Sequence, residues 1–186
     1  MLPLEAGEWQ SFNETTQHQA ELSYPSVFGG SGTIKLEVGQ RELPMRAVQD
    51  VPLSTLLLDP LFNEPAVSPV RASALDAIEA YAEKVRATLT RKDPAPRDLY
   101  DLHHAASSAV LDWQNDEFLD LAARKVAGEP PTDWLSEDRI SAFRKGLQTE
   151  LRPVLRPDAF AAFDFDQALT TMTAIAEALK PRLREV

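Results

Sequence analysis

The chain has 186 residues, 44% hydrophobic and 26% charged, a composition ordinary for one globular domain or a domain with a small appendage. It contains no cysteine, which excludes disulfides, thiolate metal sites and a thiol nucleophile. Its net charge of −10 predicts a poor general binder of nucleic acid or anionic membranes. No apolar run approaches the roughly 20 residues that span a bilayer, and no signal peptide is visible, so we expect a cytoplasmic protein.

Alternating apolar residues indicate strands in the first fifty residues. Residues 18–24 alternate, and residues 34–38 (IKLEV) form the clearest pattern, with three apolar side chains predicted inward and Lys35 and Glu37 outward. The segment FGGSG at 28–32 predicts a hairpin loop, because it lacks the Lys-Ser/Thr continuation of a P-loop and precedes a strand. A third strand is expected at 41–45, and residues 49–69, which contain four prolines, are predicted to form a connecting loop.

Apolar residues spaced by three and four predict helices through the rest of the chain. Ser73 is the expected cap of the first helix, Asp93 of the second and Ser136 of the fourth, while Gly128 ends the third. The sequence therefore predicts an α+β fold, in which a small antiparallel or mixed sheet precedes a bundle of about five helices. We expect two regions, residues 1–70 and 71–186, and helices near residues 73–92, 94–113, 116–127, 136–151 and 164–184.

Lys84 is unusual within the first predicted helix. No acidic residue lies three or four positions away, so the common intrahelical ion pair is absent. Lys84 flanks the apolar seam, and the small residues Ala77 and Ala80 on the same side leave room for another element to approach. The structural alternative to a functional lysine is one whose stem covers the core while its amine stays in water.

Asp98 and Asp101 are three residues apart and share one face of the second predicted helix. Their position in its first two turns is also explained by the helix dipole, which favours carboxylates there. The loop between the two helices is short, so we expect an antiparallel hairpin with Lys84 at the level of Asp98. A lysine beside a carboxylate is held charged, ready to bind a phosphate or to act as a general acid or base.

Five positive charges fall within fourteen residues of this acidic chain. One interpretation is a solvated face at a helix turn, and the other is contact with nucleotide or RNA phosphate. The five residues are Lys84, Arg86, Arg91, Lys92 and Arg97.

Lys35 and Glu37 share the outer face of the IKLEV strand. They are either the solvent side of a half-buried strand or a lysine and carboxylate of a sheet-based active site. Asp164 and Asp166 could suggest a metal pair, but helix capping explains them better. We predict no metal site, because the histidines have no metal-ligand spacing; they are His18, His103 and His104.

Three segments together resemble a known family. Residues 79–92 read EAYAEKVRATLTRK, residues 97–102 read RDLYDL, and residues 34–38 read IKLEV. This combination resembles the AbiEii/AbiGii nucleotidyltransferase toxin family, which pairs an "AEK(L/V)RAL…R" helix with an "RDLYDL" helix. The resemblance covers roughly residues 18–110.

The resemblance implies a polymerase-β-like nucleotidyltransferase core, partly represented by residues 1–70, and a helical C-terminal domain. Such proteins are toxins of bacterial type IV toxin–antitoxin systems, which serve abortive infection and phage defence. Studied members transfer nucleotides to RNA, with tRNA ends as the target class, so the family implies Mg²⁺ and a nucleoside triphosphate as cofactors. Carried over by motif, Lys84 and Asp98 are catalytic candidates, and Asp101 supports them. Lys35 and Glu37 occupy the family's second motif, with Glu37 as a further catalytic candidate.

The chain departs from the family at the metal site. The family places Gly-Ser and then Asp-x-Asp upstream of the IKLEV strand, and no such pair precedes Lys35. Phosphoryl transfer of this kind depends on divalent cations held by carboxylates. We therefore expect the C-terminal part of a toxin, truncated or degenerate and inactive alone. The alternative is a non-catalytic helical module that binds an antitoxin or another protein. We expect nucleotide, RNA and antitoxin as partners, and neither membrane nor DNA.

Overall fold

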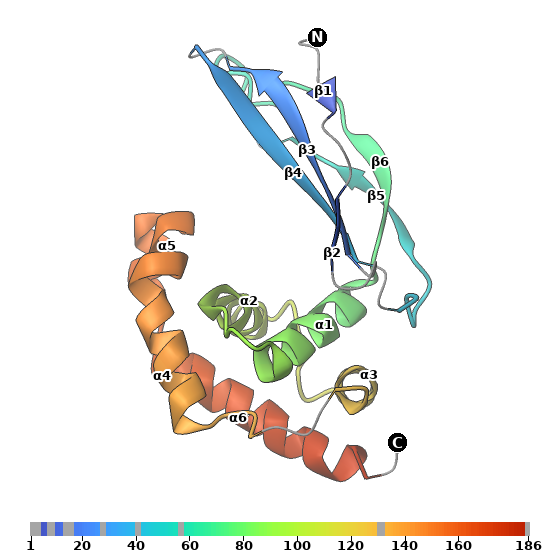
Figure 1. The fold of residues 1–186 in the computed structure, drawn as a ribbon, viewed down its shortest axis with the longest axis vertical. Helices are drawn as coiled ribbons and strands as arrows, with labels where there is room; N and C mark the ends of the chain where they lie inside the picture. The colour runs from blue at the N-terminus through green and yellow to red at the C-terminus, as the bar shows by residue number, and fades with distance from the viewer. Residues whose placement is uncertain are drawn as a thin grey trace. The chain divides into compact units, whose positions relative to one another are not determined.

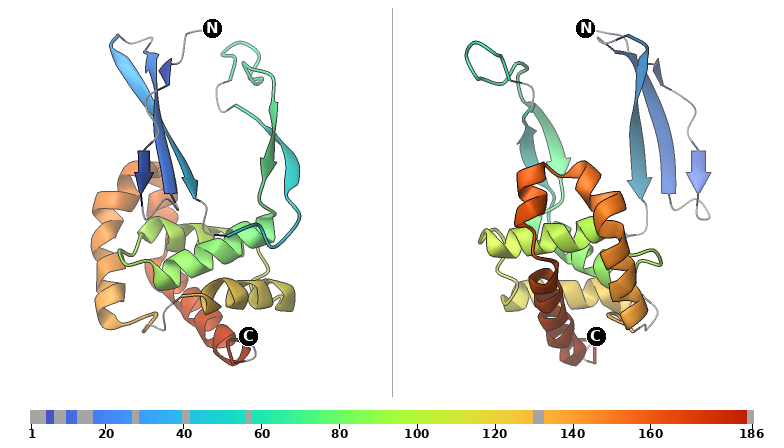
Figure 2. Two further views of the ribbon diagram at one scale, coloured as in Figure 1. Left: turned by 45° about the vertical axis from the view of Figure 1, so that its right-hand side comes forward. Right: turned by 90° about the vertical axis from the view of Figure 1, so that its left-hand side faces the viewer.

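The computed structural model describes residues 5–6, 10–12, 17–26, 29–39, 42–55, 58–129 and 133–184. The chain divides into two compact units, Met1–Met45 and Arg46–Val186. The described part of the first unit contains strands alone, and that of the second contains a strand hairpin and helices (Figures 1 and 2). This is the predicted α+β class. None of the helices in these ranges is long and apolar enough to cross a membrane.

The first unit is an antiparallel sheet built around one strand, β3 (Gln17–Pro25). The strands β1 (Glu5–Ala6), β2 (Gln10–Phe12) and β4 (Ser31–Gly39) all pair with it. The pairing of β3 with β4 runs along the whole length of both strands. The strands predicted from alternation at 18–24 and 34–38 are therefore confirmed.

The turn between β3 and β4 uses two glycines in the left-handed region. Gly29 has φ +88° and Gly30 has φ +76°, a conformation that costs a glycine little because it has no Cβ. Ser26 N donates to Gly30 O at 3.0 Å and closes the turn. The predicted hairpin loop is confirmed, although Phe28 lies outside the described residues.

The apolar residues of β4 were predicted to point inward, but they are exposed. Ile34, Leu36 and Val38 are 44%, 38% and 44% exposed. The described residues of this unit form a single sheet, and the side chains of a strand are buried only where another layer packs on them. The third predicted strand is also absent, since residues 42–45 are not in a strand.

The predicted loop at 49–69 contains a strand. The strands β5 (Gln49–Leu53) and β6 (Val70–Ala74) pair as an antiparallel hairpin within the second unit. The strand β5 was not predicted because it contains Pro52, and proline disfavours strands. Both strands of a two-stranded sheet are edge strands, however, and an edge strand tolerates the missing N–H of proline. The second unit thus begins at Arg46 and includes residues that the sequence grouped with the first sheet.

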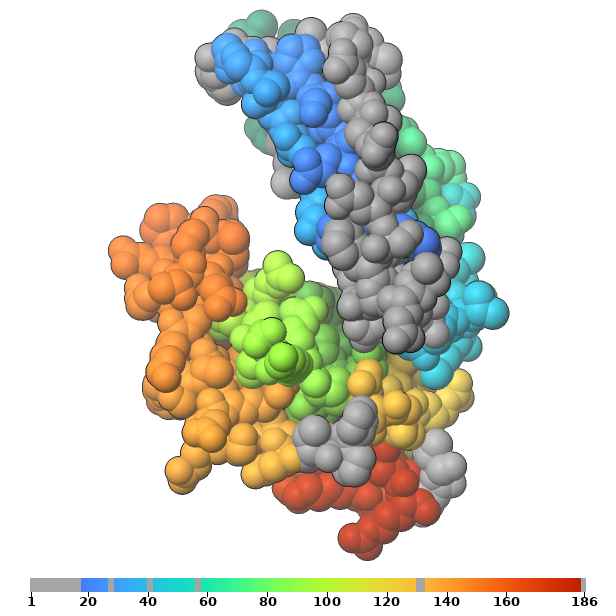
Figure 3. Space-filling view, in the orientation of Figure 1, coloured from blue at the N-terminus to red at the C-terminus, as the bar shows by residue number. Residues whose placement is uncertain are grey.

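The helices of the second unit follow the predicted order and pack as one continuous body in the space-filling view (Figure 3). Of the six α-helices among the described residues, five correspond to predicted ones, and the short α5 was not expected. They are α1 (Ala77–Thr90), α2 (Pro96–Ser107), α3 (Asp116–Ala127), α4 (Glu137–Gly146), α5 (Pro157–Ala162) and α6 (Phe165–Arg182), and between α4 and α5 lie a π-helical turn (Leu147–Leu151) and a 3₁₀ turn (Arg152–Val154).

Local hydrogen bonds explain two differences in the helix ends. The cap of α1 is Asp76, whose side chain accepts from Ile78 N at 3.0 Å, while the predicted cap Ser73 lies in β6. Helix α2 ends at Ser107 instead of near residue 113, because Ala109 adopts φ +56° and the next two N–H groups donate to Ala105 O.

The core positions the first two helices against each other. Five residues of the predicted seams, distributed over α1 and α2, are at most 2% exposed. Leu75, another predicted seam residue, is 43% exposed because it precedes the helix. The two helices therefore form the predicted hairpin around a common apolar contact. The buried seam residues are Ala82, Val85, Leu89, Leu99 and Leu102.

Candidate functional site

The helix hairpin brings Lys84 between two carboxylates. Lys84 Nζ lies 3.0 Å from Asp98 Oδ1 and 2.8 Å from Asp101 Oδ2. Lys84 projects from the middle of α1, and the two aspartates project from the first two turns of α2. The predicted proximity of these side chains, within about 6 Å, is confirmed.

Asp98 is the buried centre of this cluster. It is 3% exposed, whereas the side chains of Lys84 and Asp101 are 37% and 41% exposed. Arg91 Nη1 lies 3.0 Å from Asp98 Oδ2, at ion-pair distance but without the alignment of a hydrogen bond. Asp98 therefore forms ion pairs with two cations, Lys84 and Arg91, that are seven residues apart in the sequence.

The two carboxylates keep the Lys84 amine charged. Partial burial lowers the pKa of Lys84, but hydrogen bonds from its amine to Asp101 and Asp98, together with their negative charges, outweigh burial and raise the pKa above 10.5. An ammonium has three N–H donors, and Asp98 and Asp101 take two of them. The third donor and the partial exposure of the side chain fit a contact with an anionic oxygen of a ligand.

The raised pKa of Lys84 predicts a loss of stability at alkaline pH. The ion pair contributes fully below pH 10.5, the ordinary lysine value, and its contribution disappears as pH rises through the folded-state pKa. We expect the free energy of unfolding of wild type to fall toward that of Lys84→Met above this pH. Denaturant titrations of both proteins across about pH 8–12 test this, and a constant difference across the range contradicts it.

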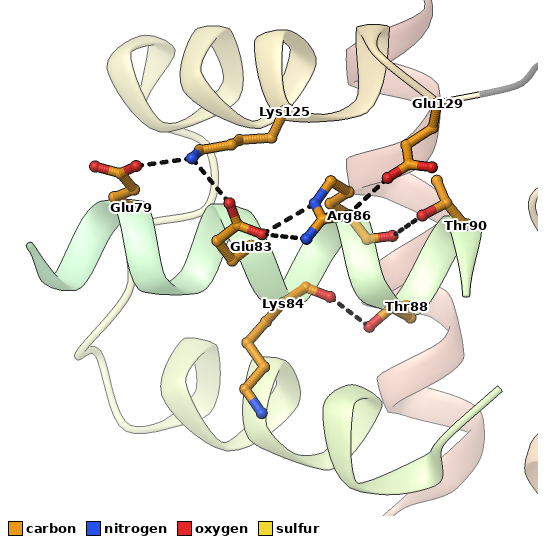
Figure 4. A network of polar contacts seen from close by, with 8 residues as sticks. All are labelled: Glu79, Glu83, Lys84, Arg86, Thr88, Thr90, Lys125 and Glu129. Atoms are coloured by element: carbon orange, nitrogen blue, oxygen red, sulfur yellow. Dashed lines mark hydrogen bonds and ion pairs between the residues drawn. The ribbon is translucent and has the colours of Figure 1, made fainter. Parts of the chain in front are cut away.

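The opposite side of α1 carries a second charged cluster, which ties it to α3 (Figure 4). Lys125 Nζ lies 2.7 Å from Glu79 Oε1 and 2.8 Å from Glu83 Oε1. Arg86 in turn contacts Glu83 at 2.6 Å and Glu129 at 2.7 Å. Figure 4 shows Lys84 extending away from these residues. The structure thus separates Arg86 from Lys84, although the sequence grouped them in one basic stretch.

The remaining sequence candidates lie elsewhere. Arg97 and Lys92 are exposed near the turn of the hairpin. Lys35 and Glu37 form an exposed ion pair at 2.9 Å on β4, in the first unit, and Gln19 Nε2 donates to Glu37 Oε1 at 2.5 Å. The candidates on the IKLEV strand therefore lie in the first unit, whereas Lys84 and Asp98 lie in the second.

The side chains that the structure describes include no group of three His, Asp or Glu residues placed to hold a metal ion. Asp164 caps α6, accepting from Gln167 N at 2.9 Å, as the capping interpretation predicted. Asp166 pairs with Arg144 at 2.8 Å. The described residues do not fit the divalent-cation site that the family implies.

A pocket of about 320 Å³ adjoins the Lys84–Asp101 ion pair. Three lining residues come from α1 and two from α2. Tyr81 and His104 were not predicted as site residues, although each lies three positions from a predicted one and so shares its helical face. The pocket is lined by Ala80, Tyr81, Lys84, Asp101 and His104.

The helix hairpin that holds Lys84 between Asp98 and Asp101 contains two of the three segments on which the resemblance in the sequence rests. The family described as "Nucleotidyl transferase AbiEii toxin, Type IV TA system" matches residues 5–180, and the chain belongs to this family. The resemblance seen in the sequence is confirmed.

A solved structure also shows similarity to this chain. It is MenT4, a nucleotidyltransferase toxin from Mycobacterium tuberculosis, with 20% sequence identity and a TM-score of 0.47. The match covers 91% of this chain and 68% of MenT4. A comparison with curated proteins found no match.

Proposed function

We propose that the protein binds a nucleoside triphosphate and RNA at the Lys84 centre, as the helical part of a toxin that transfers nucleotides to RNA such as tRNA. The observation that carries this proposal is the Lys84 amine held between Asp98 and Asp101, with one donor left for a phosphate oxygen. Arg91 and Arg97 supply further positive charge on the same hairpin. A nucleotide-transferring toxin acts in the cytoplasm, where a cognate antitoxin would control it.

The proposal is tested by binding. We expect wild type to bind nucleoside triphosphates and short RNA weakly, and Lys84→Ala to lose about 10- to 100-fold in affinity, since a hydrogen bond to a charged group contributes about 1.5–3 kcal/mol. NMR titrations follow such weak binding. Lys180→Ala is a matched lysine control, because Lys180 forms an exposed ion pair with Glu177 on α6. Equal affinities for wild type and Lys84→Ala would overturn the proposal.

We also propose that the chain does not transfer nucleotides alone. Nothing before Lys35 in the sequence supplies the Asp-x-Asp pair that the reaction's divalent cations need. We expect no labelling of tRNA when the protein is incubated with magnesium and each radiolabelled nucleoside triphosphate. Labelling above a no-protein control, or submicromolar affinity for a magnesium nucleotide, would contradict this expectation.

The same missing pair favours a second candidate function, a non-catalytic helical module that binds an antitoxin or another protein. The two candidates differ at Lys84. A protein-binding module needs no nucleotide, so it predicts that wild type and Lys84→Ala are equally inert toward nucleotide and RNA.

A further inference from the structure

The pocket beside Lys84 has a polar end and an aromatic wall. Lys84 and Asp101 form its polar end, and Tyr81 and His104 line it from the neighbouring turns of α1 and α2. On each helix the aromatic residue is three positions from the charged one, so both pairs point into the same space between the helices.

The aromatic residues are held in place by their own packing. Tyr81 packs against the hydrophobic core of the helical unit. The His104 ring lies 5.8 Å from the Tyr100 ring, and the Tyr100 ring meets Phe163 edge-on at 5.3 Å. The contact with Tyr100 restricts the otherwise exposed His104 ring, which lowers the conformational entropy that ligand binding would have to remove.

The pocket has the size of one nucleoside. Its volume of about 320 Å³ is at the lower end of the roughly 300–1,000 Å³ typical of small-molecule sites, which is enough for a single base and ribose. Ala80 keeps the α1 side open, because its side chain is a single methyl group. The polar end matches the rest of a nucleotide, since the Asp101 carboxylate can accept from a ribose hydroxyl and the Lys84 ammonium can donate to a phosphate.

We infer that this pocket binds the nucleoside of one nucleotide, with the base against Tyr81 and His104 and the phosphate on Lys84. Tyr81 and His104 thereby become base-contacting residues. The inference rests on the proposed function, in which Lys84 contacts phosphate, and adds the part of the ligand that the phosphate contact leaves undefined. A base has an aromatic face whatever its identity, so stacking accepts all four nucleotides.

Comparing nucleotides with inorganic tripolyphosphate separates the base from the phosphate. Stacking of a base on an aromatic side chain contributes about 1–3 kcal/mol, so we expect Tyr81→Leu to weaken nucleoside triphosphate binding at least about fivefold. Tripolyphosphate binding should stay unchanged in Tyr81→Leu and fall in Lys84→Ala. Tyr81→Phe, which keeps the ring, should bind nucleotides within about twofold of wild type.

Two further variants test the walls of the pocket. His104→Ala should weaken nucleotide binding, whereas His103→Ala should not, because the adjacent His103 ring packs on Phe163 and does not line the pocket. Ala80→Leu should block nucleotides by filling the space, and Ala127→Leu, at an exposed position on α3, is its control. Thermal melts of each variant separate loss of binding from loss of fold.

The nucleoside could belong to a free nucleotide or to the 3′ end of an RNA strand. Titration with nucleoside triphosphates and with a short single-stranded RNA distinguishes the two, since Tyr81→Leu should weaken whichever ligand places its base in the pocket. The inference is overturned if Tyr81→Leu binds both ligands as wild type does while Lys84→Ala is impaired. If wild type binds neither, or Lys84→Ala binds normally, the proposed function itself fails.

Discussion

Lys125→Ala is expected to lower the free energy of unfolding by about 3–5 kcal/mol, the cost of removing one partner of a buried ion pair. The Lys125 side chain is 2% exposed and that of its partner Glu79 is 1% exposed. Glu79 Oε2 also accepts from Arg46 N at 2.8 Å, so the carboxylate is fixed in place. Without the lysine, Glu79 either remains charged in the core or takes up a proton, and both cost stability. Denaturant titration of the two proteins measures the difference.

Lys180→Ala is a matched lysine control for this prediction. Lys180 pairs with Glu177 at 2.5 Å, but both side chains are more than half exposed, so its loss should cost under about 1 kcal/mol. The double variant Lys125→Met with Glu79→Gln should recover part of the lost stability, because it leaves no buried charge uncompensated at this pair. A loss in Lys125→Ala no larger than in Lys180→Ala would contradict the buried-pair interpretation.

The two charged clusters differ in how far the sequence could predict them. Lys84 and Asp98 are joined by one short loop, so helical periodicity and an antiparallel hairpin were enough to place them together. Lys125 and Glu79 come from helices that are not consecutive, and their contact depends on how α3 packs against α1. Periodicity gives the faces of each helix but not the pairing of distant helices. The buried lysine was therefore missed.

The strands show a similar limit. Alternation located β3 and β4, yet it could not tell whether Ile34, Leu36 and Val38 are covered, because coverage depends on a second layer and not on the strand itself. The β5–β6 hairpin was missed because Pro52 interrupts its pattern. The proximity of side chains on one hairpin was thus predictable. The pocket beside them was not, because its shape depends on how closely α1 and α2 pack.

Consider a toxin in which a segment with the Asp-x-Asp pair is joined upstream of this chain. In that toxin, Lys84→Ala is expected to abolish growth inhibition. Loss of a positioned group that stabilises charge in a transition state typically costs roughly 10²- to 10³-fold in rate. The fold should survive, because Lys84 is partly exposed and flanks the apolar seam. The buried Asp98 would also retain its ion pair with Arg91. We expect a stability loss of at most about 1.5–3 kcal/mol, the range for hydrogen bonds to charged groups.

Leu102→Ala separates this functional effect from simple unfolding. Leu102 is 2% exposed in the seam between α1 and α2, so its truncation should cost about 2–5 kcal/mol of stability through lost contacts and a cavity. It removes no charged group from the Lys84 centre, and the folded fraction should keep its activity. The measurements are growth on induction, protein level and thermal melts of wild type, Lys84→Ala, Asp98→Ala and Leu102→Ala. Full growth inhibition by a stably folded Lys84→Ala protein would make Lys84 a structural lysine whose stem covers the hairpin seam.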